Sequence, residues 1–229
     1  MTGAPFPRHL LAGDSESAAR ALIGAFLVRG NGPNARIGRI VEVEAYVGIE
    51  DLASHARFGR TNRNAVMFGP PGVAYVYLVY GMHHCLNVIT EAEGRPAALL
   101  IRALEPVSGI EEMRTARIAA AGRTSTRRGH DSDIARIGGL PAARLASGPG
   151  LVCACFTIDR TTDGDDLCDP GSDLRLEAAP DAQMRLPVAQ SPRVGIGYAT
   201  EPWLSKPWRF FVEGNPAVSG PRVAATAAQ

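Results

Sequence analysis

Lysine is almost absent from this 229-residue sequence: Lys206 is the only lysine among 24 basic residues. The formal net charge is only +1, whereas a nucleic-acid-binding domain is usually strongly basic. Composition alone therefore gives no support to a nucleic-acid partner. A genome-wide codon bias is enough to explain the excess of arginine, although arginine is the better phosphate ligand wherever it clusters.

Cysteine is also scarce, and the four cysteines, at positions 85, 153, 155 and 168, lack the spacing of a zinc site. Cys153 and Cys155 lie in an apolar run, so we expect buried free thiols there. The N-terminus has no basic stretch followed by an apolar signal core, and no apolar run approaches the length of a membrane span. From these absences we expect a soluble, cytoplasmic protein.

Apolar residues are plentiful enough to bury a full core, since 45% of the residues are hydrophobic and 21% are charged. The length fits one large domain, and no internal repeat or linker divides the chain. We expect a single mixed α/β (α+β) domain over residues 1–219, followed by a disordered alanine-rich tail over 220–229.

The most informative stretch runs from Ile40 to His55. Its first eight residues alternate with period two, as in a strand with two chemically different faces. One face is apolar and predicts contact with the core, while the other carries Ile40, Glu42, Glu44 and Tyr46. An ordinary half-exposed strand with two solvated glutamates explains this pattern as well. An acid, a tyrosine and, after a turn, a lone histidine instead indicate a pocket for a flat substrate.

Residues 73–90 predict a β-hairpin, because two β-rich runs flank Gly81-Met82. The tip presents Tyr80, Met82 and His83, whereas hairpin tips are normally built from Asn, Asp, Gly or Ser. An aromatic tip is either tucked under a neighbouring segment or inserted into a partner. Insertion between stacked bases is one such use.

Further elements are predicted from local patterns. We expect helices over 15–24 and 110–120, a short strand at 26–28, a buried strand from 97 that ends at Glu105-Pro106, and strands at 193–198 and 207–212. Residues 121–139, rich in glycine and arginine, predict a mobile basic loop. Arg102 follows an apolar run and needs a partner, either in a salt bridge or in a site.

Two chemistries fit the candidate side chains poorly. A metal site formed by Glu44, His55 and either His83 or His84 has none of the usual ligand spacings. Carbohydrate hydrolysis by Glu42 and Glu44 would use two carboxylates ~6.5 Å apart at the backbone. Those carboxylates stand side by side on one strand, however, rather than on opposite sides of a bond.

N-glycosidic hydrolysis of a damaged nucleotide needs only one carboxylate to activate water. It also needs an aromatic sandwich for the extruded base and a plug for the gap left in the duplex. Glu44 supplies the carboxylate, and the hairpin tip supplies the plug. The rings of Tyr46, His55 and Tyr77 supply the sandwich.

A set of motifs in the same order along the chain carries a family resemblance. They are Arg39-Ile-Val-Glu-Val-Glu-Ala-Tyr46, His55, Arg63-Asn64 with Met67-Phe68, Tyr75-Val-Tyr-Leu-Val-Tyr-Gly-Met82, Asn87, Leu104-Glu-Pro106, Ser147-Gly-Pro149 and Arg193-Val-Gly-Ile-Gly197. This set strongly resembles the alkyladenine (3-methyladenine) DNA glycosylases of the mammalian type, which is also found in bacteria. The resemblance runs from about the first helix to Pro216.

The resemblance implies a role for each matching residue. Glu44 would activate the attacking water, which Arg102 and the main-chain carbonyl of Val194 would hold. The base-binding residues would be Tyr46 on one face of the flipped base, His55 and Tyr77 on the other, and Asn87, whose amide would reject normal guanine by steric conflict. Tyr80 would be inserted through the minor groove, with Met82 and His83 beside it, and Arg60, Arg63 and Asn64 would contact or support the DNA backbone. His83 departs from the family, in which a phenol is common at this position.

The family hydrolyses the bond to alkylated or deaminated purines, such as 3-methyladenine, 7-methylguanine, hypoxanthine and ethenoadenine. We therefore expect a base-excision repair glycosylase that leaves an abasic site. No lysine lies near the motifs to form a Schiff base, which predicts a monofunctional enzyme. We expect no cofactor or metal, double-stranded DNA with damaged purines as partner, a monomer, and a place at the bacterial nucleoid. The alternatives are a non-catalytic nucleic-acid-binding module on the same fold and a carbohydrate glycosidase.

The resemblance also predicts the architecture in more detail. We expect a curved, mostly antiparallel sheet with helices around it. The Tyr80 hairpin would project from the face that meets DNA.

Overall fold

The other elements are arranged around the longest strand pair, β2 (Arg36–Val47) and β5 (Ala97–Ser108). The computed structural model describes residues 3–123, 127–179 and 186–221, without the side chains of 127–130. Within these residues eight strands form one sheet in the order β3-β4-β5-β2-β1-β6, with β8 paired to both β2 and β7. The remaining strands are β1 (Phe26–Arg29), β3 (Ala74–Val79), β4 (His83–Ile89), β6 (Leu174–Glu177), β7 (Val188–Ser191) and β8 (Arg209–Val212).

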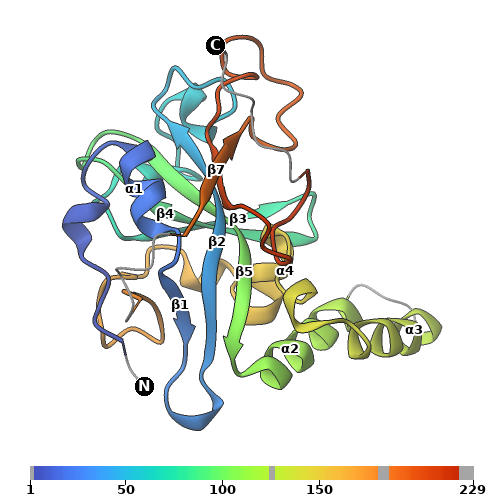
Figure 1. The fold of residues 1–229 in the computed structure, drawn as a ribbon. Helices are drawn as coiled ribbons and strands as arrows, with labels where there is room; N and C mark the ends of the chain where they lie inside the picture. The colour runs from blue at the N-terminus through green and yellow to red at the C-terminus, as the bar shows by residue number, and fades with distance from the viewer. Residues whose placement is uncertain (1–2, 124–126, 180–185, 222–229) are drawn as a thin grey trace.

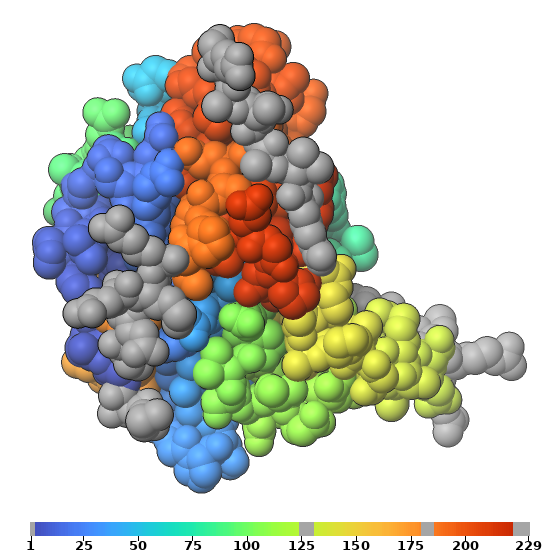
Figure 2. All heavy atoms as spheres, in the orientation of Figure 1, coloured from blue at the N-terminus to red at the C-terminus, as the bar shows by residue number. Residues whose placement is uncertain are grey.

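The sheet is antiparallel throughout the described pairs and curls into a half-barrel. The helices are α1 (Ser15–Leu22), α2 (Ile110–Gly122), α3 (Arg127–Gly138) and α4 (Pro149–Phe156). α1 packs on β2 and β5, α4 packs on β4 and β5, and α2 packs on α4. α3 packs on α2, and Figures 1 and 2 show both helices extending away from the sheet. The predicted mixed class is confirmed.

Local sequence explains the first helix and the hairpin after it. The Asp14 side chain accepts a hydrogen bond from the Ser17 N–H at 2.9 Å, so it caps the N-terminus of α1. Ala18, Ala19 and Leu22 then face the core. β1 and β2 pair as an antiparallel hairpin across the glycine-rich turn at 30–34.

Both faces of β2 are buried, so the interpretation of β2 as a half-exposed strand with solvated glutamates is wrong. Val41, Val43 and Ala45 belong to the main hydrophobic core. On the other face, Glu42 and Glu44 are both 0% exposed. β5 and β8 flank β2 on either side, and they supply the arginines that contact these glutamates: Arg102 from β5 and Arg209 from β8.

Three predicted elements differ in the structure. β5 continues through Pro106, which lies opposite Gly38 of β2. β4 pairs only with Ala98–Leu100. At position 106 no described strand lies on the other edge of β5, so this edge tolerates a proline. Residues 127–138 form α3 rather than a loop. Residues 193–198 are not a strand, because Gly195 has a φ of +79° and the chain turns there; the strand is β7, just before them.

The predicted hairpin is present as β3 and β4, with Val79 opposite His83. Tyr80 and Gly81 have φ values of +51° and +70°, and the Met82 N–H donates to the Val79 carbonyl at 3.1 Å, as in a type I′ turn. Tyr80 is 87% exposed, so none of the segments that the structure describes covers it.

Three smaller expectations concern the thiols, the membrane and the tail. Cys153 and Cys155 are buried and free, as predicted. Among the described residues, no helix combines the length and the apolar character needed to cross a bilayer. Most of the predicted tail, residues 222–229, lies outside the described residues.

Candidate active site

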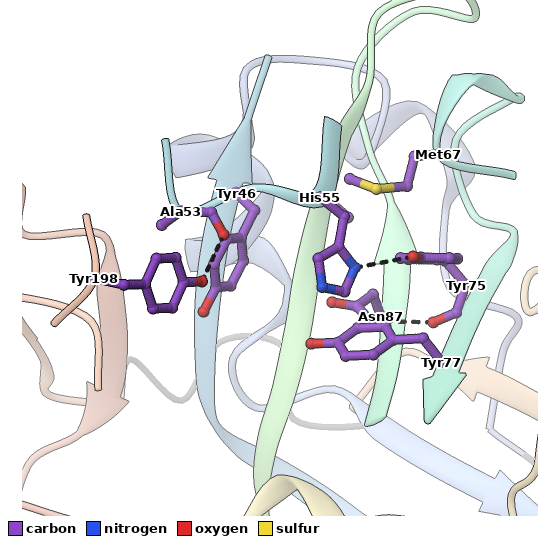
Figure 3. Close-up of a pocket in the computed structure, with 9 residues that line it drawn as sticks. Tyr46, Ala53, His55, Met67, Tyr75, Tyr77, Asn87 and Tyr198 are labelled. Atoms are coloured by element: carbon purple, nitrogen blue, oxygen red, sulfur yellow. Dashed lines mark hydrogen bonds between the residues drawn. The ribbon is translucent and has the colours of Figure 1, made fainter. Parts of the chain in front are cut away.

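A pocket lies between β2 and the β3–β4 hairpin. It is lined by Tyr46, Ala53, His55, Met67, Tyr75, Tyr77, Asn87, Ala98 and Tyr198, and its empty space of about 350 Å³ includes an opening to solvent. Figure 3 shows Tyr46 on one side of the space, with His55 and Tyr77 on the other. The structure thus brings together all four residues that were predicted to contact a base.

Short polar contacts hold His55 at the edge of the pocket. His55 begins a 3₁₀ turn (His55–Phe58), and the Ser54 hydroxyl accepts from the Ala56 N–H at 3.1 Å. The buried Asn64 amide donates to the carbonyls of His55 (3.0 Å) and Gly59 (2.9 Å). Asn64 therefore supports the His55 turn from inside the protein.

His55 packs into an aromatic corner. Its ring lies 4.3 Å from that of Tyr77 at 70°, and its Nδ1 lies 3.0 Å from the Tyr75 hydroxyl. Burial, together with the positive charges of Arg63 and Arg57, lowers the pKa of His55 to about 4. The imidazole is neutral near pH 7, so it presents an uncharged aromatic wall.

Tyr46 is held in place by contacts to its ring and to its hydroxyl. The Arg193 guanidinium lies 4.6 Å from the ring centre, and Arg193 is held by two contacts to Asp51 at 2.6 and 2.9 Å. The Tyr46 hydroxyl donates to Glu44 Oε2 at 2.9 Å. The phenol therefore links the aromatic pocket to the buried carboxylate.

Glu44 lies beyond the Tyr46 hydroxyl and has polar partners on both oxygens. Oε1 accepts from the Val194 N–H at 2.6 Å, and Oε2 also accepts from Arg102 Nη1 at 3.2 Å. A carboxylate has about four acceptor positions; three are occupied, which leaves one on Oε1. Burial raises the pKa of Glu44, while Arg102 and the Val194 N–H oppose that rise. Glu44 is therefore more basic than a solvated glutamate.

Arg102 and Val194 both contact Glu44. Arg102 forms salt bridges with Glu42 and Glu44, so it is both a salt-bridge residue and a site residue. Val194 uses its N–H, and the predicted role of its carbonyl in holding water stays a prediction. Within the described ranges, no three His, Cys, Asp or Glu side chains converge in a way that would hold a metal ion.

The predicted DNA-contacting residues lie around the hairpin. Tyr80, Met82 and His83 are all exposed at its tip. Arg63 Nη2 donates to the Leu78 carbonyl at 3.3 Å, and the Arg60 guanidinium lies 5.8 Å from the Phe68 ring centre. In the part of the chain that the structure describes, neither arginine pairs with a carboxylate, so both charges are available to an anion.

Sequence reasoning missed several pocket residues. Tyr75 had a signal, because it shares the period-two face of Tyr77. Tyr198 lines the pocket and donates to the Ala53 carbonyl at 3.1 Å; only the glycines just before it marked its segment. Asp51 had no signal, because its partner Arg193 is 142 residues away.

The fold and the site define a protein with a pocket between aromatic side chains, beside a buried carboxylate. A profile of the methylpurine-DNA glycosylase family matches residues 9–216. A relative from Anaeromyxobacter sp. (strain Fw109-5) is 45% identical over 93% of this chain and 91% of its own length. Relatives from Methanocella arvoryzae (43%) and Legionella pneumophila (38%) each cover 93% of the chain, and 94% and 97% of their own lengths. All three carry the provisional name 3-methyladenine DNA glycosylase.

The chain therefore belongs to the methylpurine-DNA glycosylase family. This membership makes it a DNA glycosylase of DNA repair.

Proposed function

We propose that this protein hydrolyses the N-glycosidic bond of alkylated or deaminated purines in double-stranded DNA, with Glu44 activating the water. The observation that carries the proposal is a fully buried carboxylate hydrogen-bonded to the tyrosine that lines a flat aromatic pocket. A module that only binds DNA has no use for such a carboxylate, because DNA is a polyanion. The names of the relatives point to methylated adenine as one substrate.

The damaged purine would be flipped out of the duplex and held between Tyr46 and the His55–Tyr77 pair. A neutral His55 favours this stack, because a cationic lesion such as 3-methyladenine meets no like charge. The Asn87 amide, fixed by its bond to the Tyr75 carbonyl at 3.1 Å, would exclude the exocyclic amino group of guanine. Tyr80, with Met82 and His83, would fill the gap in the duplex.

In the chemical step, a water oxygen bonds to the sugar C1′ while the C1′–N bond breaks. The water proton passes to Glu44, and the electron pair of the broken bond leaves with the base. A cationic base departs as a neutral molecule, whereas a neutral base such as hypoxanthine also needs a proton. Arg102 balances the charge of Glu44 and, with the Val194 carbonyl, would hold the water.

The fate of the DNA strand follows from the scarcity of lysine. Lys206 stacks on Trp203 and Trp208 at 4.2 and 4.1 Å and is not among the residues that line the pocket. Without a lysine at the pocket to form a Schiff base, the reaction would stop at the abasic site. We propose residues 1–219 as the glycosylase domain and a cytoplasmic monomer as the working form.

The test uses duplexes that carry one hypoxanthine, one ethenoadenine or a mixture of methylated bases, with wild-type protein and Glu44→Gln. We expect the wild type to release base, and Glu44→Gln to lose about 10²- to 10⁴-fold in rate, the usual worth of a positioned acid or base. Lesion binding should persist in the variant. Release that survives in Glu44→Gln would overturn the choice of base, and no release from any duplex would favour the binding module.

A further inference from the structure

Glu42 is the second glutamate on the polar face of β2, and the proposed reaction does not use it. Its side chain is fully buried, yet its carboxylate accepts three hydrogen bonds. The donors are Arg102 Nε at 2.9 Å, Arg209 Nε at 2.7 Å and the Ser219 N–H at 2.6 Å. A buried carboxylate is costly unless it is paired and hydrogen-bonded, so this site is built to hold a charge.

Arg102 lies between Glu42 and Glu44 and is held by three separate partners. Its Nε bonds to Glu42, its Nη2 to the Ser219 hydroxyl at 3.3 Å, and its Nη1 to Glu44 Oε2 at 3.2 Å. A free guanidinium prefers to grip a carboxylate with two parallel bonds. Because two of its three nitrogens are already engaged, Arg102 reaches Glu44 with one nitrogen only.

Arg209 and the end of the described chain anchor Glu42 from the other side. Arg209 lies on β8, where it donates Nη2 to the Ser219 carbonyl at 2.7 Å and Nη1 to the Pro221 carbonyl at 2.7 Å. These bonds fix the Ser219 N–H against Glu42. Residues 219–221 lie beyond the family-matched segment 9–216, so the network reaches further along the chain than the match does.

We propose that Glu42 is a positioning residue for the reaction: anchored by Arg209 and Ser219, it holds Arg102 edge-on to Glu44 and so leaves Glu44 free to accept a proton from water. This inference rests on the proposed function. Two glutamates share two arginines here, which keeps the charges of the cluster balanced. Removal of Glu42 frees Arg102 to engage both oxygens of Glu44.

The pH dependence of the reaction reports on this arrangement. The titratable and charged groups that face Glu44 are Arg102, Glu42, Tyr46, Tyr77 and Cys85. The negative charge of Glu42 raises the pKa of Glu44, and a tighter contact with Arg102 would lower it. Removal of the Glu42 charge therefore has two effects of the same sign. Glu44 becomes a weaker base that ionises at a lower pH.

The test is the single-turnover release of hypoxanthine from a duplex as a function of pH, for wild type and Glu42→Gln at saturating protein. We expect the acid limb of the Glu42→Gln profile to move down by about one pH unit. The plateau rate should fall by ~tenfold, because a weaker base accepts the proton less readily. The Kd for the lesion duplex should stay within about twofold, since Glu42 is far from solvent.

Glu177→Gln is the matched control. Glu177 is also a buried strand glutamate, 4% exposed and paired with an arginine, Arg175 Nε, at 2.9 Å, but it lies on β6 at the far edge of the sheet. We expect the control to lose stability and keep the wild-type pH profile. An unshifted profile in Glu42→Gln, with a loss no larger than in Glu177→Gln, would overturn the proposal and leave Glu42 as a structural residue.

A second variant decides the question if Glu42→Gln does not fold. Ser219→Ala removes only the hydroxyl that holds Arg102 Nη2, near the end of the chain. We expect a smaller shift of the acid limb in the same direction, and an unchanged profile would overturn the proposal. A wild-type protein that releases no base would instead overturn the proposed function, and this inference with it.

Discussion

The β2 strand and the tip of the β3–β4 hairpin depart in opposite ways from the usual pattern, in which apolar side chains are buried and charged ones are exposed. On β2 and beside its C-terminal end, charged side chains are buried, as with Glu42 and Glu44 on the strand and the Asp51–Arg193 pair next to it. At the tip of the β3–β4 hairpin, Tyr80 and Met82 are 87% and 58% exposed. Buried charge and exposed aromatic surface are both costly unless a partner or a function compensates.

The buried and the exposed region differ in what contacts their side chains. The buried carboxylates of Glu42, Glu44 and Asp51 are satisfied by the protein itself, through hydrogen bonds that fix them in place. Tyr80 and Met82 at the tip of the hairpin are exposed, and under the proposed function the DNA would cover them. We infer that chemistry belongs to the first region and DNA distortion to the second. Stability and binding should therefore respond to mutation in opposite patterns.

The largest effect on stability is expected at the buried Asp51–Arg193 pair. Asp51→Asn leaves a buried guanidinium without its counter-charge and should cost about 3–5 kcal/mol in the free energy of unfolding. The matched control is Asp166→Asn, because Asp166 pairs with Arg8 at the same 2.6 Å, but both side chains are about two-fifths exposed. Urea unfolding should show a loss of at most about 1 kcal/mol for the control. If the two variants lost the same free energy of unfolding, burial of the ion pair would not be what sets its contribution to stability.

The opposite pattern is expected at the hairpin tip. Tyr80→Asn removes the ring, and asparagine tolerates the positive φ of this position. Stability should change by less than about 0.5 kcal/mol. The free energy of binding to a lesion duplex should become less favourable by about 1–3 kcal/mol, the contribution of one base–aromatic stack.

Fluorescence anisotropy in a Glu44→Gln background measures the Kd for this duplex without turnover. Val107→Ser, an exposed apolar residue on β5, serves as the control for general surface effects and should bind normally. Unchanged binding in Tyr80→Asn would remove the hairpin tip from the DNA interface.

The sequence reveals much of the first region and little of what holds it together. Alternation from 40 to 47 identifies β2, and the order of motifs identifies Glu44 and the pocket rings. Alternation does not reveal that β8 pairs with β2 and brings Arg209 to Glu42, since β8 starts more than 150 residues later. The contact from Ser219 to Glu42 spans 177 residues and has no local signal.

Secondary structure predicted from local sequence is wrong at two places where neighbouring elements determine the backbone conformation. Proline at 106 is typical of a strand end. In the structure, the edge of β5 that faces away from β2 has no described partner strand at this position, so the proline is accepted. The stretch 193–198 has the composition of a strand, but a positive φ at Gly195 turns the chain. In both cases the neighbouring elements, which a single sequence does not place, determine the outcome.

A pH effect on stability is expected from His55. Its pKa in the folded protein is about 4, below the ordinary value of 6.5. As the pH falls from 6.5 to 4 the unfolded chain binds a proton that the folded protein does not, so stability is lost across this window. His55→Phe keeps an aromatic wall and removes this proton. Urea unfolding at pH 7 and pH 4.5 should show a smaller loss in the variant, and an equal loss would contradict the depressed pKa.

The smallest effect, and the sharpest comparison, comes from two pocket tyrosines. The Tyr46 hydroxyl donates to buried Glu44, whereas the Tyr198 hydroxyl donates to the Ala53 carbonyl at a rim that leaves Tyr198 61% exposed. Tyr198→Phe should weaken the free energy of binding to a lesion duplex by about 1 kcal/mol or less, the net contribution of a neutral hydrogen bond. It should not change the single-turnover rate. Tyr46→Phe should lower that rate, because Glu44 loses a donor that orients it. If Tyr198→Phe lost as much rate as Tyr46→Phe, the Tyr198 hydroxyl at the rim would also contribute to the chemical step, and the two hydroxyls would not differ in role.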